Sequence, residues 1–335
     1  MTWPTIVQAP MAGGPSTPDL AAAVSEAGGL GFLAAGYKTA AAMRADIDRT
    51  RALTSRPFGT NLFMPSRDDV DHAAVEKYRA RLVPEAERLG AVLGTPSPTA
   101  RDDDYDAKIA ELLDAPPAFV GFTFGTPSRD VVRALQGRGV TVVVTVTSVD
   151  EALQASQESE PDALCLQGLE AGGHRASFTN TLGGGLPVRD LLAAVRAAGT
   201  GRPLIAAGGL ATRADVADVL ARGAAAAQLG TVFVRCAESG ASAVHRAALA
   251  DPRFTSTAVT RAFSGRPARG LVNRFLAAHT GDAPAAYPDV HHVTAPLRRA
   301  ATAAGDPDVV NLWAGTSWRH APDGPAAEIV RSLAG

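Results

Sequence analysis

The sequence predicts an α/β protein built on a (β/α)8 TIM barrel, with a second, smaller and mostly helical domain over the C-terminal mouth of the barrel. Three observations lead to this prediction. Eight short apolar runs recur along the chain, helical segments separate most of them, and polar motifs containing glycine follow several of the runs. Such an alternation over 335 residues is typical of a parallel barrel.

The eight candidate strands are short apolar segments bounded by turn-forming residues. They lack the strict alternation of polar and apolar residues that marks a half-exposed strand. We therefore expect them to be buried on both faces, as the strands of a parallel sheet are. The segments are residues 6–9, 30–34, 58–62, 119–123, 141–146, 163–167, 204–207 and 226–229.

The helices between these strands are predicted from the signals at their ends. The segment TPD at 17–19 is typical of an N-cap, a first-turn proline and a first-turn acid, so a helix is expected to run to about residue 27 and stop at Gly28. The segment SVDE at 148–151 has the spacing of a capping box and predicts the helix after the fifth strand.

Two further helices belong to the end of the barrel. Thr212 and Asp215 are expected to open the helix after the seventh strand, and Gly223 is expected to end it. The last helix, over residues 326–333, is expected to return to the barrel and close its outer ring of helices.

Two stretches are too long for the loops of a minimal barrel. Residues 65–114 are charged, and we expect one long helix over 75–89 and a turn rich in Pro and Asp at 95–104. Residues 237–311 contain helical pieces and the segment HHVTAPLRRA. The predicted domains are a cofactor-binding barrel of residues 1–64, 115–236 and 312–335, and a smaller substrate-covering domain of residues 65–114 and 237–311.

The composition gives no reason to expect a nucleic acid or a membrane as a partner. The net charge is −2 and 46% of the residues are hydrophobic, which is enough for a large core. The apolar stretches are interrupted well before bilayer length, and the N-terminus lacks the regions of a signal peptide. Cys165 and Cys236 allow one disulfide but no disulfide framework, so a reducing cytoplasmic location is expected.

Two motifs containing glycine follow the last two predicted strands. Gly208 and Gly209 come after the seventh strand, and Gly230 and Thr231 come after the eighth. The loops at these positions form the usual phosphate site of this barrel, because glycine lets backbone N–H groups approach phosphate oxygens and a hydroxyl adds a donor. Tight turns would also need glycine, but two such motifs on consecutive strands favour a phosphate site.

The loop after the sixth strand carries the candidate reacting groups. Gln167 ends that strand, and its amide can both donate to and accept from the edge of a flavin or purine ring. Gly172 and Gly173 permit backbone conformations that other residues avoid. His174 follows, and a histidine at a barrel mouth is a candidate base or anion stabiliser because its ordinary pKa lies near neutrality. An isolated loop histidine would be structural, but the glycines and the strand end favour a function.

Other positions carry weaker signals. Asn61 is expected to end the third strand at the barrel mouth, where it is a candidate site residue or a simple turn residue. His291 and His292 are adjacent on a segment expected to be extended, where they would point to opposite faces, so no metal site is predicted. Cys165 lies within the sixth strand and is expected to be a small buried residue.

Taken together, these motifs resemble the nitronate monooxygenase family, formerly called 2-nitropropane dioxygenases, in its bacterial class I form. The resemblance covers nearly the whole chain, and its most specific part is QGxEAGGH combined with AGG and QxGT. The resembling segments are QAPMAGG, FGTNLF, FTFGTPS, QGLEAGGHR, IAAGGLATRADV, AAQLGTVFVRCAES, GRPARGLVNRF, HHVTAPLR and NLWAG.

The resemblance implies non-covalent FMN and the oxidation of alkyl nitronates by O2 to carbonyl compounds and nitrite. It implies that His174 is the catalytic histidine. At Thr123 some members carry histidine, so a second active-site histidine is missing here and the substrate preference stays open. The resemblance implies FMN contacts from Asn61, Gln167, Gly172, Gly209, Gln228, Leu229, Gly230 and Thr231.

Three kinds of function are compatible with this pattern. The first is the monooxygenase, whose partners would be a small nitronate and O2, acting as a monomer or a homodimer. The second is a reductase of the same fold that takes hydride from NAD(P)H, as NADH:quinone reductases and enoyl-acyl-carrier-protein reductases do. The third is a flavin carrier without enzymatic activity, which would not need the GGH loop. Anaerobic bleaching of the flavin by NADH or NADPH would separate the first two.

Overall fold

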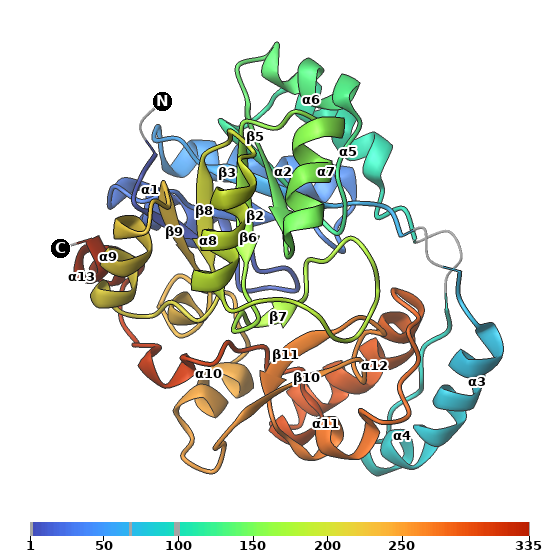
Figure 1. The fold of residues 1–335 in the computed structure, drawn as a ribbon. Helices are drawn as coiled ribbons and strands as arrows, with labels where there is room; N and C mark the ends of the chain where they lie inside the picture. Colours follow the sequence, from blue (N-terminus) through green and yellow to red (C-terminus); the bar gives the residue numbers. More distant parts are fainter. Residues whose placement is uncertain (1–2, 67–68, 97–100, 335) are drawn as a thin grey trace.

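The computed structural model describes residues 3–66, 69–96 and 101–334. These residues form an eight-stranded parallel sheet with helices on its outside, and a smaller unit lies against one end of it (Figure 1). The strand order is β1-β9-β8-β6-β5-β4-β3-β2, and a parallel bridge between Val7 and Leu30 connects the two edges. The predicted (β/α)8 barrel is confirmed.

Each predicted barrel strand is present, with ends within two residues of those expected. The register sets Gln8 beside Leu229 and Gln167 beside Ala207, so the carboxyl ends of neighbouring strands lie level with one another. The motifs that follow the strands therefore meet at one mouth. The strands are β1 (Ile6–Gln8), β2 (Phe32–Ala34), β3 (Gly59–Phe63), β4 (Phe119–Thr123), β5 (Thr141–Val146), β6 (Ala163–Gln167), β8 (Leu204–Ala207) and β9 (Ala226–Leu229).

Large and small apolar side chains from the barrel strands pack together in one buried cluster. Phe32, Phe119 and Ile205 belong to it, and so does Cys165, which is buried as predicted. Cys165 and Cys236 are both free thiols. A second and larger cluster packs between the strands and the surrounding helices, which explains why the strand sequences are apolar on both faces.

The helices of the outer ring begin and end largely where the sequence predicts. Thr17 caps the first helix, Thr212 and Asp215 form a complete capping box, and Gly28 and Gly223 follow their helices with φ angles of 88° and 93°. The last helix packs on α1 and α9, as expected. The ring helices are α1 (Pro18–Glu26), α2 (Ala40–Leu53), α5 (Tyr105–Asp114), α6 (Arg129–Gln136), α7 (Val149–Glu158), α8 (Val188–Ala198), α9 (Arg213–Ala221) and α13 (Ala326–Ala334).

The capping box predicted for α7 forms only in part. Ser148 accepts a hydrogen bond from the Glu151 N–H, as an N-cap should. The Glu151 carboxylate does not bond back to the N-cap backbone. It accepts instead from the N–H and hydroxyl of Thr147 and from the Phe178 N–H. Because Phe178 lies in the loop after β6, this carboxylate ties that loop to the start of α7.

The smaller unit combines two segments that are far apart in the sequence. Its buried cluster joins apolar side chains of residues 75–93 with those of residues 234–318. Figure 1 shows α3 and α4 beside α12, and the three-stranded antiparallel sheet of this unit lies on the side that faces the barrel. Its elements are α3 (His72–Arg81), α4 (Val83–Leu89), β7 (Gly173–His174), α10 (Ala243–Ala250), β10 (Thr257–Thr260), β11 (Ala268–Leu271), α11 (Arg274–His279) and α12 (Asp289–Ala303), with the short 3-10 helices η3 (Pro307–Val309) and η4 (Trp318–His320). The short 3-10 helix η2 (Thr231–Phe233) follows β9 and packs in the core of the barrel.

Two predictions in this unit are wrong. The single helix expected over 75–89 is broken at Leu82, because Pro84 lacks an N–H and starts the first turn of α4. The segment that carries His291 and His292 is helical and not extended. The helix continues through Pro296. The Val293 carbonyl, one turn before this proline, accepts a hydrogen bond from the Gly94 N–H. Part of the turn expected at 95–104 lies outside the described residues.

The assignment of residues to two domains stays a prediction. Helix α5 falls in the stretch expected for the smaller domain, yet it packs against the ring helices α2 and α6. None of the helices formed by the described residues has the length and apolar character that crossing a bilayer requires.

Candidate active site

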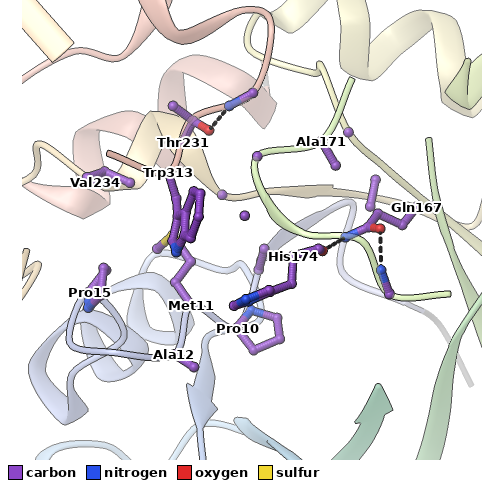
Figure 2. A pocket seen from close by; sticks show the side chains of 18 of the residues that line it. Pro10, Met11, Ala12, Pro15, Gln167, Ala171, His174, Thr231, Val234 and Trp313 are labelled. Atoms are coloured by element: carbon purple, nitrogen blue, oxygen red, sulfur yellow. Dashed lines mark hydrogen bonds between the residues drawn. The ribbon is translucent and has the colours of Figure 1, made fainter. Parts of the chain in front are cut away.

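The carboxyl ends of the barrel strands open into a cavity of about 280 Å³. Segments of the smaller unit close its other side. Figure 2 shows side chains from both parts around this space, with His174 projecting from the loop after β6 near Trp313. All nine predicted site residues line the cavity: Asn61, Gln167, Gly172, His174, Gly209, Gln228, Leu229, Gly230 and Thr231. The structure brings them together, and their roles towards a cofactor stay predictions.

The two predicted phosphate loops present free backbone donors. Gly208 and Gly209 have φ angles of 111° and 69°, which side chains rarely adopt. A Cβ atom at Gly209 would also lie 2.7 Å from the Cβ of Glu170. Within the described part of the chain, no acceptor bonds the N–H of Gly209 or Gly230. These glycines therefore leave room and hydrogen-bond donors for an anionic group.

Thr231 connects these loops to the segment before η4. Its hydroxyl oxygen accepts from the Gly315 N–H at 3.0 Å, which leaves the hydroxyl hydrogen for another acceptor (Figure 2). Gly315 lies against Gly172, where a Cβ atom would be 2.4 Å from the Gly315 nitrogen. The Ser317 hydroxyl donates to the Gly209 carbonyl at 2.6 Å. The loops after β6, β8 and β9 therefore all contact the segment of Gly315 and Ser317 around the predicted phosphate position.

Gln167 has a role in the structure that the sequence did not predict. Its amide nitrogen donates to the His174 carbonyl at 2.9 Å, and its amide oxygen accepts from the Ala176 N–H at 2.8 Å (Figure 2). Both polar ends of the side chain are therefore used within the loop. Gln167 fixes the position of His174, and any contact with a ring would compete with these bonds.

His174 lies among aromatic rings in the cavity. Its ring centroid is 5.7 Å from that of Tyr287 and 5.6 Å from that of Trp313. Burial, with smaller contributions from the charges of Arg266 and Arg298, lowers the pKa of His174 to about 3. The imidazole is therefore neutral at neutral pH and has a nitrogen lone pair that can accept a proton.

Ser264 determines which nitrogen of His174 is available. Its hydroxyl oxygen lies 2.8 Å from His174 Nε2 and 3.2 Å from the Arg266 carbonyl oxygen. The carbonyl can only accept, so a Ser264 hydroxyl that donates to it must accept from His174 Nε2–H. In this tautomer Nδ1 carries the lone pair.

An aromatic wall lines the cavity next to His174, and sequence reasoning missed it. It contains Tyr37 and Phe124, whose φ angles of 67° and 76° are unusual for residues other than glycine. Phe63 and Tyr287 pack on Phe124. The guanidinium of Arg266 lies 4.0 Å from the centre of the Phe124 ring. These side chains make this side of the cavity apolar.

Helix α12 and the segment after it also contribute residues that sequence reasoning missed. His291 and Arg298 line the cavity from α12, and Asn311 and Trp313 line it from the segment that follows. From the sequence, His291 was considered only as a metal ligand, and the two segments were otherwise noted for their family resemblance. The seven-residue spacing of His291 and Arg298 places them on one face of a helix, which would have been a signal had the segment been recognised as helical.

The remaining predicted residues make contacts inside the barrel mouth. Asn61 lies in the middle of β3 and not at its end, and its amide oxygen accepts from the Thr123 hydroxyl at 3.2 Å. The Gln228 amide nitrogen lies 3.2 Å from Cys165 Sγ. The hydroxyl of Thr123 is thus engaged with another residue that lines the cavity, Asn61. No group of three or more metal-binding side chains is found among the described residues.

Comparison with known proteins identifies close relatives. The family model described as nitronate monooxygenase matches residues 2–335. The nitronate monooxygenase of Pseudomonas aeruginosa is 42% identical, over 98% of this chain and 94% of its own length. A solved structure of nitroalkane oxidase from Streptomyces ansochromogenes is 52% identical with a TM-score of 0.96, over 99% of this chain and 95% of that chain. FabK from Thermotoga maritima is 27% identical with a TM-score of 0.75, over 99% and 92%.

Proposed function

The chain belongs to the nitronate monooxygenase family and is an oxidoreductase, and from this we propose that it uses bound FMN to oxidise alkyl nitronates with O2, giving carbonyl compounds and nitrite. One observation carries the proposal. A neutral, buried histidine and the free N–H groups of two strand-end loops line the same cavity.

The residues at the barrel mouth fit a flavin mononucleotide. The N–H groups of Gly209 and Gly230 and the hydroxyl of Thr231 offer donors to one phosphate group. The close approach of Glu170 behind Gly209 excludes a side chain there and keeps the loop open. When bound, FMN supplies the redox chemistry by accepting electrons from the substrate and passing them to O2.

His174 would serve the proton chemistry of a neutral nitroalkane. The C–H bond next to the nitro group breaks, the proton moves to Nδ1, and the electron pair passes into the nitro group to form the nitronate. Gln167 and Ser264 hold the histidine for this step. A substrate supplied as the nitronate has already lost the proton, so His174 is then not needed as a base.

The proposal is tested with the purified protein. We expect a yellow protein that releases FMN on heating, and that forms nitrite and consumes O2 when ethyl nitronate is added. Anaerobic NADH or NADPH should leave the flavin oxidised. Release of FAD would contradict the cofactor assignment. Rapid oxidation of NADH by a quinone, without nitrite from any nitronate, would instead identify a reductase of the same fold.

A further inference from the structure

The cavity contains a charge without a counter-ion. Among the described residues that line it, Arg298 is the only one with a permanent charge, and none is an aspartate or a glutamate. Most other buried or half-buried charges of the chain are paired, as the Glu85 carboxylate is with Arg274. Within the described residues, no carboxylate forms an ion pair with Arg298. Since burying an unpaired charge is costly, a retained one indicates a ligand of opposite charge.

Two acidic groups on the segments that contact this region, Asp103 and Asp289, have partners of their own. Asp103, next to Tyr37, bonds to Lys108 at 2.8 Å, and Asp289 at the start of α12 bonds to Arg101 at 2.9 Å. Burial raises the pKa of Tyr37 to about 12, so its hydroxyl is neutral and cannot supply the missing negative charge. The protein around Arg298 therefore leaves its charge uncompensated.

Neutral acceptors hold the guanidinium of Arg298 in place. Its Nε donates to the Thr294 hydroxyl at 3.1 Å, and Nη1 donates to the Asn311 amide oxygen at 3.2 Å. Nη2 donates to Nδ1 of His291 at 3.1 Å and to the His291 carbonyl at 3.2 Å. Burial lowers the pKa of Arg298 only to about 10, so it stays positive at neutral pH. These bonds orient the arginine without neutralising it.

The bond to Arg298 also fixes the tautomer of His291. Arginine can only donate, so Nδ1 of His291 must accept, and the hydrogen of the neutral ring lies on Nε2. The ring stacks on Tyr37, with centroids 4.1 Å apart and planes 5° from parallel. No acceptor for Nε2–H is found within the described chain, so His291 has a free donor in the same cavity.

We infer that Arg298 and His291 form an oxyanion subsite of the substrate pocket, which binds the two oxygens of a nitronate or a nitro group. The assignment of the ligand rests on the proposed function, whereas the anion subsite itself rests on the charge and geometry of the pocket. With Nε and both hydrogens of Nη2 engaged, Arg298 keeps one free N–H on Nη1, and His291 Nε2–H is a second donor. The pair can therefore offer one donor to each oxygen of a planar nitronate.

The subsite also bears on proton removal. Arg298 lies close enough to His174 to contribute to the lowering of its pKa. As the proton leaves a nitroalkane, negative charge develops on the nitro oxygens, and a fixed cation stabilises that charge more than the neutral substrate. The anion bound beside His174 in turn favours the protonated imidazole, so the two residues assist each other.

The experiment compares three variants of the flavin-loaded protein. Arg298→Gln removes the charge. Asn311→Asp keeps the arginine and its shape but places a carboxylate where Nη1 already has its acceptor. Arg299→Gln removes a neighbouring exposed charge and serves as the control. Nitrate binding is measured by calorimetry with sodium nitrate, the KM is measured with ethyl nitronate, and melting temperature and FMN content report folding.

Both site variants should weaken nitrate binding and raise the KM for ethyl nitronate by about 10- to 100-fold, the scale of a lost hydrogen bond to a charged group. FMN content should not change, which separates this subsite from the phosphate site. Asn311→Asp should not lower the melting temperature, because it adds an ion pair. Arg299→Gln should behave as the wild type.

Unchanged nitrate binding and KM in a folded Asn311→Asp variant would overturn the subsite. Loss of FMN from that variant would do so too, because Arg298 would then serve the cofactor. If the wild type binds nitrate through Arg298 but produces no nitrite from ethyl nitronate, the subsite stands and the proposed function fails. The two failures are therefore distinguishable.

Discussion

The two walls of the cavity are built in different ways. The barrel wall lies at the ends of β8 and β9. Its residues Gly209, Gly230 and Thr231 offer backbone N–H groups and carry no charged side chain. The opposite wall, from β7, α12 and the segment around Trp313, offers rings, histidines and Arg298. Backbone donors suit a phosphate group, whereas fixed side chains suit a small substrate.

The two walls also differ in how far apart their residues lie in the sequence. The barrel wall depends on short motifs directly after strands, so its geometry follows from the neighbouring sequence. The opposite wall is assembled from segments more than a hundred residues apart, such as β7 and α12. We therefore expect changes in the barrel wall to affect the cofactor and changes in the opposite wall to affect catalysis.

The largest expected effect comes from Gly209→Glu in the barrel wall. The substitution places bulk and negative charge at the predicted phosphate position, on a backbone with a φ of 69° and 2.7 Å from the Glu170 side chain. FMN binding should be abolished, as measured by flavin content after purification and by titration of the apoprotein with FMN.

Gly199→Glu is the matched control for this substitution. Gly199 has a φ of 70°, and a Cβ atom there would meet nothing within 4 Å. It ends α8 and is absent from the residues that line the cavity. This variant carries the same charge and the same backbone cost, so it should retain FMN. Equal FMN content in both variants would show that the strand-end loops are only turns.

The second prediction concerns His174→Asn in the opposite wall. FMN should stay bound, while turnover of neutral nitroethane should fall by about 10²–10⁴, the usual contribution of a general base. Turnover of ethyl nitronate should fall much less, because this substrate has no proton to lose. Steady-state rates on the two substrates provide the measurement. Equal losses on both, with FMN intact, would refute the role as a base.

The extent to which the sequence predicts the structure differs between the same two walls. The eight strands were found because strands buried on both faces are continuous apolar runs. Gly208 and Gly209 directly follow β8, and Gly230 and Thr231 directly follow β9. Arg298 was missed because a helix containing Pro296 was taken for an extended segment. Tyr37 and Phe124 were missed because their rings reach the cavity through left-handed backbone that only tertiary packing selects.

The third prediction is smaller and concerns Thr231 in the barrel wall. Thr231→Val removes the hydroxyl that accepts from the Gly315 N–H and is predicted to donate to the phosphate. FMN binding should weaken by about 1–3 kcal/mol, the cost of losing a hydrogen bond to a charged group. Thr231→Ser keeps the hydroxyl and is the control. Equal FMN affinity in the two variants would remove Thr231 from the phosphate site.

The smallest expected effect is the acid sensitivity of the opposite wall. This wall carries His174, His245 and His291, and burial lowers the pKa of all three, whereas the glycine loops of the barrel wall have no titrating side chain. Burial lowers the pKa of His174 to about 3 and that of His245 to about 4, from an ordinary value of 6.5. Between pH 6.5 and 4 the unfolded chain therefore binds protons that the folded chain does not. Stability is fully present above pH 6.5 and falls as the pH drops, by at most about 1.4 kcal/mol per pH unit for each histidine.

Urea unfolding from pH 8 to pH 5 measures this dependence, with His245→Gln as the comparison. His245 contacts the Trp313 carbonyl, so the variant should be less stable at pH 8, where both forms of the protein carry neutral residues at this position. Its stability should nevertheless fall less steeply with acid, because one of the buried histidines is gone. If wild type and variant lose stability with the same slope, the opposite wall does not hold His245 in its neutral form, and the contrast between the two walls would not extend to their response to pH.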